Sequence, residues 1–368
     1  MNRRLAALFL VLSLLLGGCG WLDGSYVHVT PHQQNEADGQ GDTALTAENY
    51  SDLLDILEAM VESGKTSGVI YVRESGNDAV SRQLRMASDY ITVSFPLGAY
   101  AVEEITFEQG SSNARPAIAV TIAYRHTPGE IRRIPYISDM DGARSAVQKS
   151  LQSCDSRLVM RIDRYSPMDF DQLVQNLAAQ YPETVMEVPQ TVETLYGSGD
   201  SRVVELSFSY ENSRDDLRQM QSQVRPVFDS AVLYVSGDGA DSQKFSQLYG
   251  FLMERYDYKL ESSITPTYSL LRHGVGDSRA FATVYAAMCR MAGLKCEVIT
   301  GTRHGEPWTW NLVWDGEKPY HVDLLACASA DGYRQRTDAE MHGYVWDYSA
   351  YAASEPIREP ETNGTDPA

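Results

Sequence analysis

Cysteine is scarce in this chain of 368 residues, and its spacing excludes the common zinc sites. Five cysteines occur, with no Cys-x-x-Cys pair and no histidine at a distance typical of zinc ligands. We therefore expect neither a metal nor another cofactor. A disulfide between Cys289 and Cys296 is geometrically possible, because Cys289 lies late in a predicted helix and Cys296 lies early in the next strand. Buried free thiols are the alternative for these two, and for Cys154 and Cys327.

Basic residues are also few. Lys and Arg number 31 against 50 Asp and Glu, which gives a formal net charge of −19. This balance argues against nucleic acid or an anionic surface as the main partner. Two interpretations of the charge stay open: it maintains solubility, or it attracts a cationic ligand. Hydrophobic residues make up 43% of the chain, which is enough material for real cores.

The apolar segment near the N-terminus is too short to cross a membrane. Residues 5–16 are almost unbroken apolar after Arg3 and Arg4, whereas a spanning helix needs ~20 such residues. The segment is typical of a signal peptide. It ends in Leu-Gly-Gly-Cys at residues 16–19, which resembles a bacterial lipobox. The resemblance implies a lipid on Cys19 that anchors the protein at the extracytoplasmic face of a membrane. A plain secretory signal is the alternative.

Between this leader and residue 237 the pattern of helices and strands occurs twice. Each unit reads as helix, strand, helix and then two strands, judged from helical stripes and from alternating apolar residues. In the first unit the predicted elements lie at residues 53–61, 69–72, 79–90, 102–108 and 117–125. In the second they lie at residues 143–151, 159–162, 170–181, 185–195 and 203–210. This order predicts two small α+β modules, each with helices on one face of its sheet.

A third unit begins with a helix at residues 217–228 and a strand at 232–235, and then diverges.

The stretch before the first module is rich in Gly, Asp and Asn and predicts a flexible tether. The acidic, Pro-containing C-terminus predicts a disordered tail. The expected parts are a signal peptide at 1–18, the tether at 19–48, the modules at 49–135 and 136–236 (with the start of the third unit), a further domain at 237–353 and the tail at 354–368.

The further domain contains a set of motifs in a fixed order. Ser278 opens a helix with a buried stripe, and Gly293 ends it fifteen residues later. Trp-Thr-Trp-Asn follows at residues 308–311, and Tyr-His-Val-Asp at 320–323. This spacing resembles the core of the transglutaminase-like superfamily, which is built on the papain-type Cys-His-Asp plan. The resemblance implies an α+β, papain-type fold for this domain.

Two of the three catalytic positions that the resemblance implies hold another residue. Ser278 stands at the nucleophile position and Trp308 at the histidine position, while Asp323 keeps the carboxylate. A serine hydroxyl needs an adjacent base to attack a substrate, and an indole has an N–H donor but no basic nitrogen. His321, two residues before Asp323, or His304, in the turn before Trp308, could supply a substitute base.

Aromatic residues are concentrated where the base is missing. Trp308, Trp310 and Leu312 should share one face of a strand, with Asn311 on the other. Aromatic groups that line a former active-site cleft suit sugar rings or peptide side chains, and the alternative is that they belong to the core. The ligand cleft that we expect would be lined by Ser278, Trp308, Asn311, His321 and Asp323.

The sequence thus predicts a lipid-anchored, extracytoplasmic protein with a non-catalytic transglutaminase-like domain. That domain would act as a binding or scaffolding module for a cell-wall polymer or an envelope protein. The competing hypothesis is a hydrolase or acyltransferase with a rebuilt site that uses Ser278 and either His321 or His304. It requires a contact of ~3 Å between the hydroxyl and an imidazole.

Overall fold

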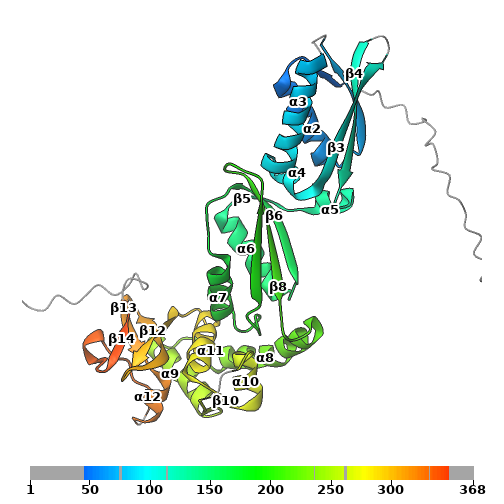
Figure 1. Ribbon diagram of the computed structural model, residues 1–368. Helices are drawn as coiled ribbons and strands as arrows, with labels where there is room; N and C mark the ends of the chain where they lie inside the picture. Colours follow the sequence, from blue (N-terminus) through cyan, green and yellow to red (C-terminus); the bar gives the residue numbers. More distant parts are fainter. Residues whose placement is uncertain are drawn as a thin grey trace, which may run out of the picture. The chain divides into compact units, whose positions relative to one another are not determined.

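A computed structural model describes residues 45–73, 77–112, 115–235, 237–260, 263–330 and 332–347 (Figure 1). The predicted signal peptide, Cys19, most of the predicted tether and the tail at 354–368 lie outside the described residues. Residues 45–47, which the sequence assigned to the tether, form a short strand. None of the described helices combines the length and the apolar character that crossing a membrane requires.

The first module is a four-stranded sheet with helices. Its elements are β1 (Leu45–Ala47), α2 (Tyr50–Ser63), β2 (Ser67–Val72), α3 (Asn77–Asp89), a π-helical turn (Tyr90–Ser94), α4 (Pro96–Ala101), β3 (Val102–Ser112) and β4 (Arg115–Tyr124). The strand order is β1-β2-β4-β3. Helix α2 starts where the Asn49 side chain accepts a hydrogen bond from the Asp52 N–H, and ends at Gly64 in the left-handed region.

The second module repeats this arrangement. A short α5 (Pro128–Arg133) leads to β5 (Tyr136–Asp139), α6 (Met140–Gln152), β6 (Arg157–Arg164), α7 (Phe170–Gln180), β7 (Gln190–Tyr196) and β8 (Arg202–Ser209). The strand order is β5-β6-β8-β7, which is the order of the first sheet. The predicted repeat of α+β modules agrees with these matching sheets. The sequence pattern missed β1 and β5, because strands of three or four residues with one buried position show no periodicity.

The predicted strand at residues 232–235 is wrong. Helix α8 (Arg214–Tyr234) runs through it, because Val224, Phe228 and Ala231 continue one buried helical stripe. Of the β-forming side chains near its end, Tyr234 is exposed and Val232 is half-buried, so they do not decide the backbone conformation. The strand expected at 185–195 begins only at Gln190.

The C-terminal part is a second kind of α+β fold. It contains α9 (Asp241–Met253), β9 (Asp257–Tyr258), α10 (Pro266–His273), β10 (Val275–Gly276), α11 (Ser278–Met291), β11 (Cys296–Arg303), β12 (Glu306–Asp315), β13 (Lys318–Val322), α12 (Leu324–Ala328), a 3₁₀ turn (Asp338–Glu340) and β14 (Tyr344–Trp346). The main sheet has the order β13-β12-β11-β14, and β9 pairs with β10 in parallel.

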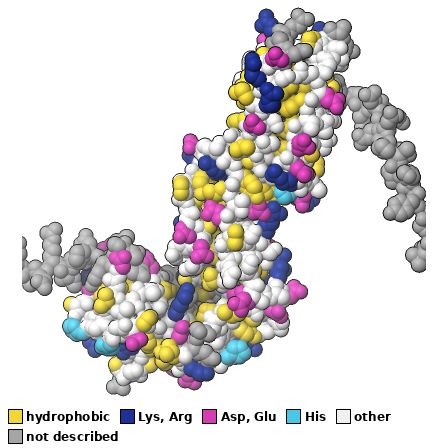
Figure 2. Space-filling model, in the orientation of Figure 1, with side chains coloured by type: hydrophobic (Ala, Val, Ile, Leu, Met, Phe, Trp, Pro, Cys, Tyr) yellow, Lys and Arg dark blue, Asp and Glu magenta, His cyan; other side chains and the backbone are white. Residues whose placement is uncertain are grey.

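Strand β12 separates two cores in this part. On one face, Val313 packs in a cluster with α11, and Asn311 Nδ2 donates to the Ala282 carbonyl at 2.8 Å. On the other face, Trp310 and Leu312 pack with Ile299 and Met341. The predicted alternation along this strand is confirmed. Figure 2 shows acidic and basic side chains interspersed over the visible surface.

Candidate functional site

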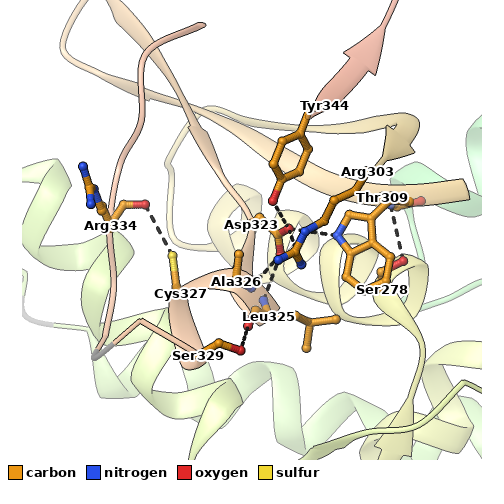
Figure 3. A network of polar contacts seen from close by, with 11 residues as sticks. Ser278, Arg303, Thr309, Asp323, Leu325, Ala326, Cys327, Ser329, Arg334 and Tyr344 are labelled. Carbon is orange, nitrogen blue, oxygen red and sulfur yellow. Dashed lines mark hydrogen bonds and ion pairs between the residues drawn. The ribbon is translucent and has the colours of Figure 1, made fainter. Parts of the chain in front are cut away.

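Ser278 is positioned by the first turn of α11. Asp277 caps this helix, because its carboxylate accepts the Ala280 N–H at 2.8 Å. The Ser278 side chain is half-buried, and its Oγ accepts the backbone N–H of Thr309 at 3.3 Å. Ser278 therefore lies beside the residue that follows Trp308 on β12, as Figure 3 shows.

Asp323 lies where β13 ends and α12 begins. It is 2% exposed, and its Oδ1 accepts the backbone N–H groups of Leu325 and Ala326, each at 3.0 Å. A carboxylate at a helix N-terminus is stabilised by such N–H donors and by the helix dipole. The Oδ1 atom of Asp323 therefore caps the N-terminus of α12.

The other oxygen of Asp323, Oδ2, accepts hydrogen bonds from three side chains. Trp308 Nε1 donates at 2.9 Å, Tyr344 Oη at 2.6 Å and Arg303 Nη1 at 3.4 Å. The donors come from β12, β14 and β11. Figure 3 shows the side chains of Tyr344 and Arg303 pointing toward Asp323. Burial, together with the hydrogen bond to Asp323, raises the pKa of the Tyr344 phenol well above its usual value.

Arg303 also contacts two of these aromatic rings. Its guanidinium carbon lies 5.2 Å from the centroid of the Trp308 ring and 5.7 Å from that of Tyr344, which is cation–π distance. Arg303 offsets the buried charge of Asp323 through a 3.4 Å ion pair. No local pattern in the sequence points to Arg303, because the strand pairing of β11 with β14 links positions far apart in the chain.

Trp308 and Asp323, which the resemblance places at the histidine and carboxylate positions, are therefore in direct contact. The contact is a hydrogen bond from an indole, which has no basic nitrogen to accept a proton from Ser278. The pair can hold the strands together, but it does not supply a general base.

His321 lies in a different environment. It is 1% exposed; its Nδ1 accepts the Trp310 indole N–H at 2.9 Å, and its Nε2 lies 2.9 Å from Asp338 Oδ1. An accepting Nδ1 leaves the proton on Nε2, which donates to Asp338. Burial lowers the pKa of His321, and Asp338 partly opposes that shift. Both ring nitrogens are therefore engaged away from Ser278.

His304 occupies the tight turn between β11 and β12. Its φ of 53° is in the left-handed region, its backbone N–H donates to the Gly343 carbonyl at 2.7 Å, and the residue is exposed. In the part of the chain that the structure describes, neither His304 nor His321 hydrogen-bonds the Ser278 hydroxyl.

Aromatic rings lie on the surface side of this site. The Tyr258 ring centroid is 5.8 Å from that of Trp308, and Tyr258 is 43% exposed. Tyr258 lies opposite Gly276, two residues before Ser278, in the β9–β10 pair. Trp308 is half-buried, whereas Trp310 and Trp314 are buried in the core. The Tyr258 ring was not among the residues that the sequence predicted for this site.

The four cysteines of the described chain are free thiols, and Cys289 and Cys327 are buried. Burial raises the pKa of both, as expected for inert structural thiols. Among the described residues, no group of three His, Cys, Asp or Glu side chains is arranged to hold a metal ion.

Residues 230–350 match the family model of the Transglutaminase-like superfamily, so this part of the chain is a transglutaminase-like domain. No curated protein matches the sequence. Among solved structures, a TGase is 11% identical with a TM-score of 0.28, covering 62% of this chain and 68% of that chain. A "putative cysteine protease" from Cytophaga hutchinsonii is 15% identical with a TM-score of 0.26, covering 45% and 69%. The domain assignment rests on the match at residues 230–350.

Proposed function

We propose that the transglutaminase-like domain is a non-catalytic module that binds a cell-surface polymer or protein. The observation that carries this proposal is the hydrogen bond from Trp308 Nε1 to Asp323. The carboxylate that would orient a catalytic histidine instead accepts five donors: two backbone N–H groups and the side chains of Trp308, Tyr344 and Arg303. The hydrogen bonds of Asp323 stabilise the fold, and no imidazole lies at Trp308 for this carboxylate to orient.

The hydroxyl of Ser278 supports the same interpretation. Its described contact is with a backbone N–H, which cannot remove a proton. Without an adjacent base a serine hydroxyl stays protonated near neutral pH and is a poor nucleophile. We therefore do not favour the alternative, a hydrolase or acyltransferase with Ser278 as nucleophile.

The binding surface that we propose is the pair of rings from Tyr258 and Trp308, next to Ser278. Tyr258 offers a large exposed aromatic area, and aromatic faces of this kind stack on sugar rings and on apolar side chains. The neighbouring Trp308 is held in place by Asp323 and Arg303, so that little conformational freedom is lost when a ligand binds.

The location proposed for this module is the extracytoplasmic face of a membrane, with lipid on Cys19 as the anchor. The two α+β modules would then act as a spacer or as a second binding surface. Replacing Cys19 by Ala should remove incorporated radioactive palmitate and release the protein from the membrane fraction. Retention of both would contradict the lipid anchor and leave the binding proposal standing.

Binding can be tested by co-sedimentation of the purified chain, without its leader, with insoluble peptidoglycan. We expect Tyr258→Ala to lower the binding constant at least about fivefold, because one aromatic contact is worth about 1–3 kcal/mol and 1.4 kcal/mol is tenfold. Tyr136→Ala is the matched control, because Tyr136 is also an exposed tyrosine but lies in the second module. Equal binding by both variants would overturn the proposed surface, and no binding by the wild type would overturn peptidoglycan as ligand.

A further inference from the structure

The edge of the second module's sheet is open. Strand β7 is the last strand in the order β5-β6-β8-β7. Among the described strands it pairs with β8 alone, through seven consecutive residue pairs from Gln190↔Ser209 to Tyr196↔Val203. Its other side therefore presents backbone N–H and C=O groups that no strand of the described chain uses. Such a row is a template for another strand.

Both faces of β7 are also accessible. Five of its seven residues are exposed, and they include neighbours that point to opposite faces. Val192 is 62% exposed and Leu195 is 44% exposed. Val188, just before the strand, is exposed as well. Apolar side chains on an open edge add a driving force for association to the unpaired backbone groups.

The first module provides an internal comparison, because β3 occupies the same end position in its sheet. Strand β3 carries Glu103, Glu104 and Glu108, and its register with β4 shifts between Val102 and Glu104. Charged residues and irregular register are the usual protection of an edge against further pairing. Strand β7 has an unbroken register and one charged residue where β3 has three, so the two repeats differ at the position that controls strand addition.

The single charge on β7 identifies the kind of strand that fits. Glu193 lies at the middle of the strand and accepts a long hydrogen bond from Tyr165 Oη at 3.5 Å. Antiparallel pairing of β7 over its full length with a second copy would place Glu193 opposite Glu193. Like charges directly opposite each other destabilise a strand pair, and each copy carries a net charge of −19. A basic side chain at that position would be attracted instead.

We propose that β7 is a docking edge for an extended segment of a different polypeptide, which adds to the sheet as a fifth strand. Backbone hydrogen bonds along β7 would give the affinity. Selectivity would come from a basic residue opposite Glu193 and from β-branched or apolar residues beside Val192 and Leu195. This site is separate from the proposed ligand surface at Tyr258 and Trp308, and it gives the second module a role of its own.

The test uses fluorescence anisotropy with the chain lacking its leader and three labelled heptapeptides. The first alternates threonine and valine around a central lysine, the second has a central glutamate, and the third is the lysine peptide with alternate amides N-methylated. We expect the lysine peptide to bind, and the other two to bind at least about tenfold more weakly through charge repulsion or lost hydrogen bonds.

Variants locate the binding on β7. Val192→Lys, which places a charge at the edge, should weaken binding of the lysine peptide at least about tenfold. Val93→Lys is the matched control, because Val93 is a similarly exposed valine outside the sheets. Glu193→Lys should reverse the preference, so that the glutamate peptide binds more tightly than the lysine peptide. A thermal melt of each variant checks that it folds.

Three results would overturn this inference. One is that none of the peptides binds the wild type, and a second is that the N-methylated peptide binds as well as its parent. The third is sedimentation of the wild type as a dimer that Val192→Lys dissociates, which would make a second copy the occupant. None of these results bears on ligand binding at Tyr258, so the two proposals fail independently.

Discussion

The indole nitrogen of Trp308 lies 2.9 Å from an oxygen of Asp323, and it donates a hydrogen bond to a carboxylate that is almost fully buried. The bond joins β12, one of the two inner strands of the sheet, to the start of α12. The resemblance to the transglutaminase-like superfamily implies a histidine and its carboxylate partner at these two positions. In this structure the contact joins an indole donor to a carboxylate, and an indole has no basic nitrogen.

Loss of the Trp308 donor should destabilise the domain. Trp308→Phe keeps an aromatic ring but leaves the buried carboxylate of Asp323 with one hydrogen bond fewer. We expect the free energy of unfolding to fall by about 1–3 kcal/mol, the usual cost of removing one partner from a buried polar group. Urea denaturation measures it, with Tyr258→Phe, which alters an exposed ring, as a control that should change stability by less than about 0.5 kcal/mol. Equal stability of both variants would contradict the role of the indole N–H.

Neutralising Asp323 should cost more than removing one donor. Asp323→Asn places an NH₂ group among five donors and removes the carboxylate charge that pairs with Arg303. Because Arg303 is partly exposed, the expected loss is about 2–4 kcal/mol, somewhat below the cost of breaking a fully buried pair. Asp338→Asn, on the less buried partner of His321, serves as the comparison. A smaller loss for Asp323→Asn would show that the cluster around this carboxylate is not central to the fold.

Restoring the family residues should create a reactive thiol. When Ser278→Cys is combined with Trp308→His, the imidazole can contact Asp323 and lie near the introduced thiol at the start of α11, where a thiolate is stabilised. We expect alkylation at position 278 by iodoacetamide at pH 6.5 to be at least about tenfold faster than in Ser278→Cys alone. Peptide mass spectrometry distinguishes this position from the native cysteines. Equal rates would indicate that position 308 is not the histidine position.

His321 should make the stability depend on pH on the acid side of neutrality. Its folded-state pKa is lowered from 6.5 by burial, so the unfolded chain binds a proton more readily than the folded chain. Stability should therefore be full above pH 6.5 and decline as the pH falls below it toward the folded pKa. Urea denaturation between pH 7.5 and 5.5 measures the decline. His321→Gln, which does not titrate, should be less stable at pH 7.5 and show a flatter profile; an unchanged slope would argue against His321 as the source.

Much of the C-terminal domain could be predicted because its signals are local. The start of α11 at Ser278, the buried stripe of α11 and the alternation of Trp310 and Asn311 each depend on a few consecutive residues. The assignment of Asp323 to a carboxylate position came from the resemblance and stays a prediction. These features agree with one another, as expected when local preference and tertiary packing favour the same structure.

The features that sequence reasoning missed depend on distant parts of the chain. Arg303 and Tyr344 converge on Asp323 only because β14 pairs with β11 across some forty residues. His321 is turned toward Asp338 by the bridge that its backbone forms with Arg336. At residues 232–235 the β-forming side chains predicted a strand, but the burial of Phe228 and Ala231 favoured a helix. No window of neighbouring residues contains these contacts.

The most direct test of a non-catalytic domain compares turnover by the purified chain and by Ser278→Ala. The substrates are glutamine-containing peptides with an amine acceptor, a peptide amide library, and soluble peptidoglycan fragments, analysed by mass spectrometry after long incubation. The account predicts that the two proteins form product no faster than buffer does. Turnover by the wild type that Ser278→Ala abolishes would contradict it, and would show that Ser278 has found a base despite the tryptophan at position 308.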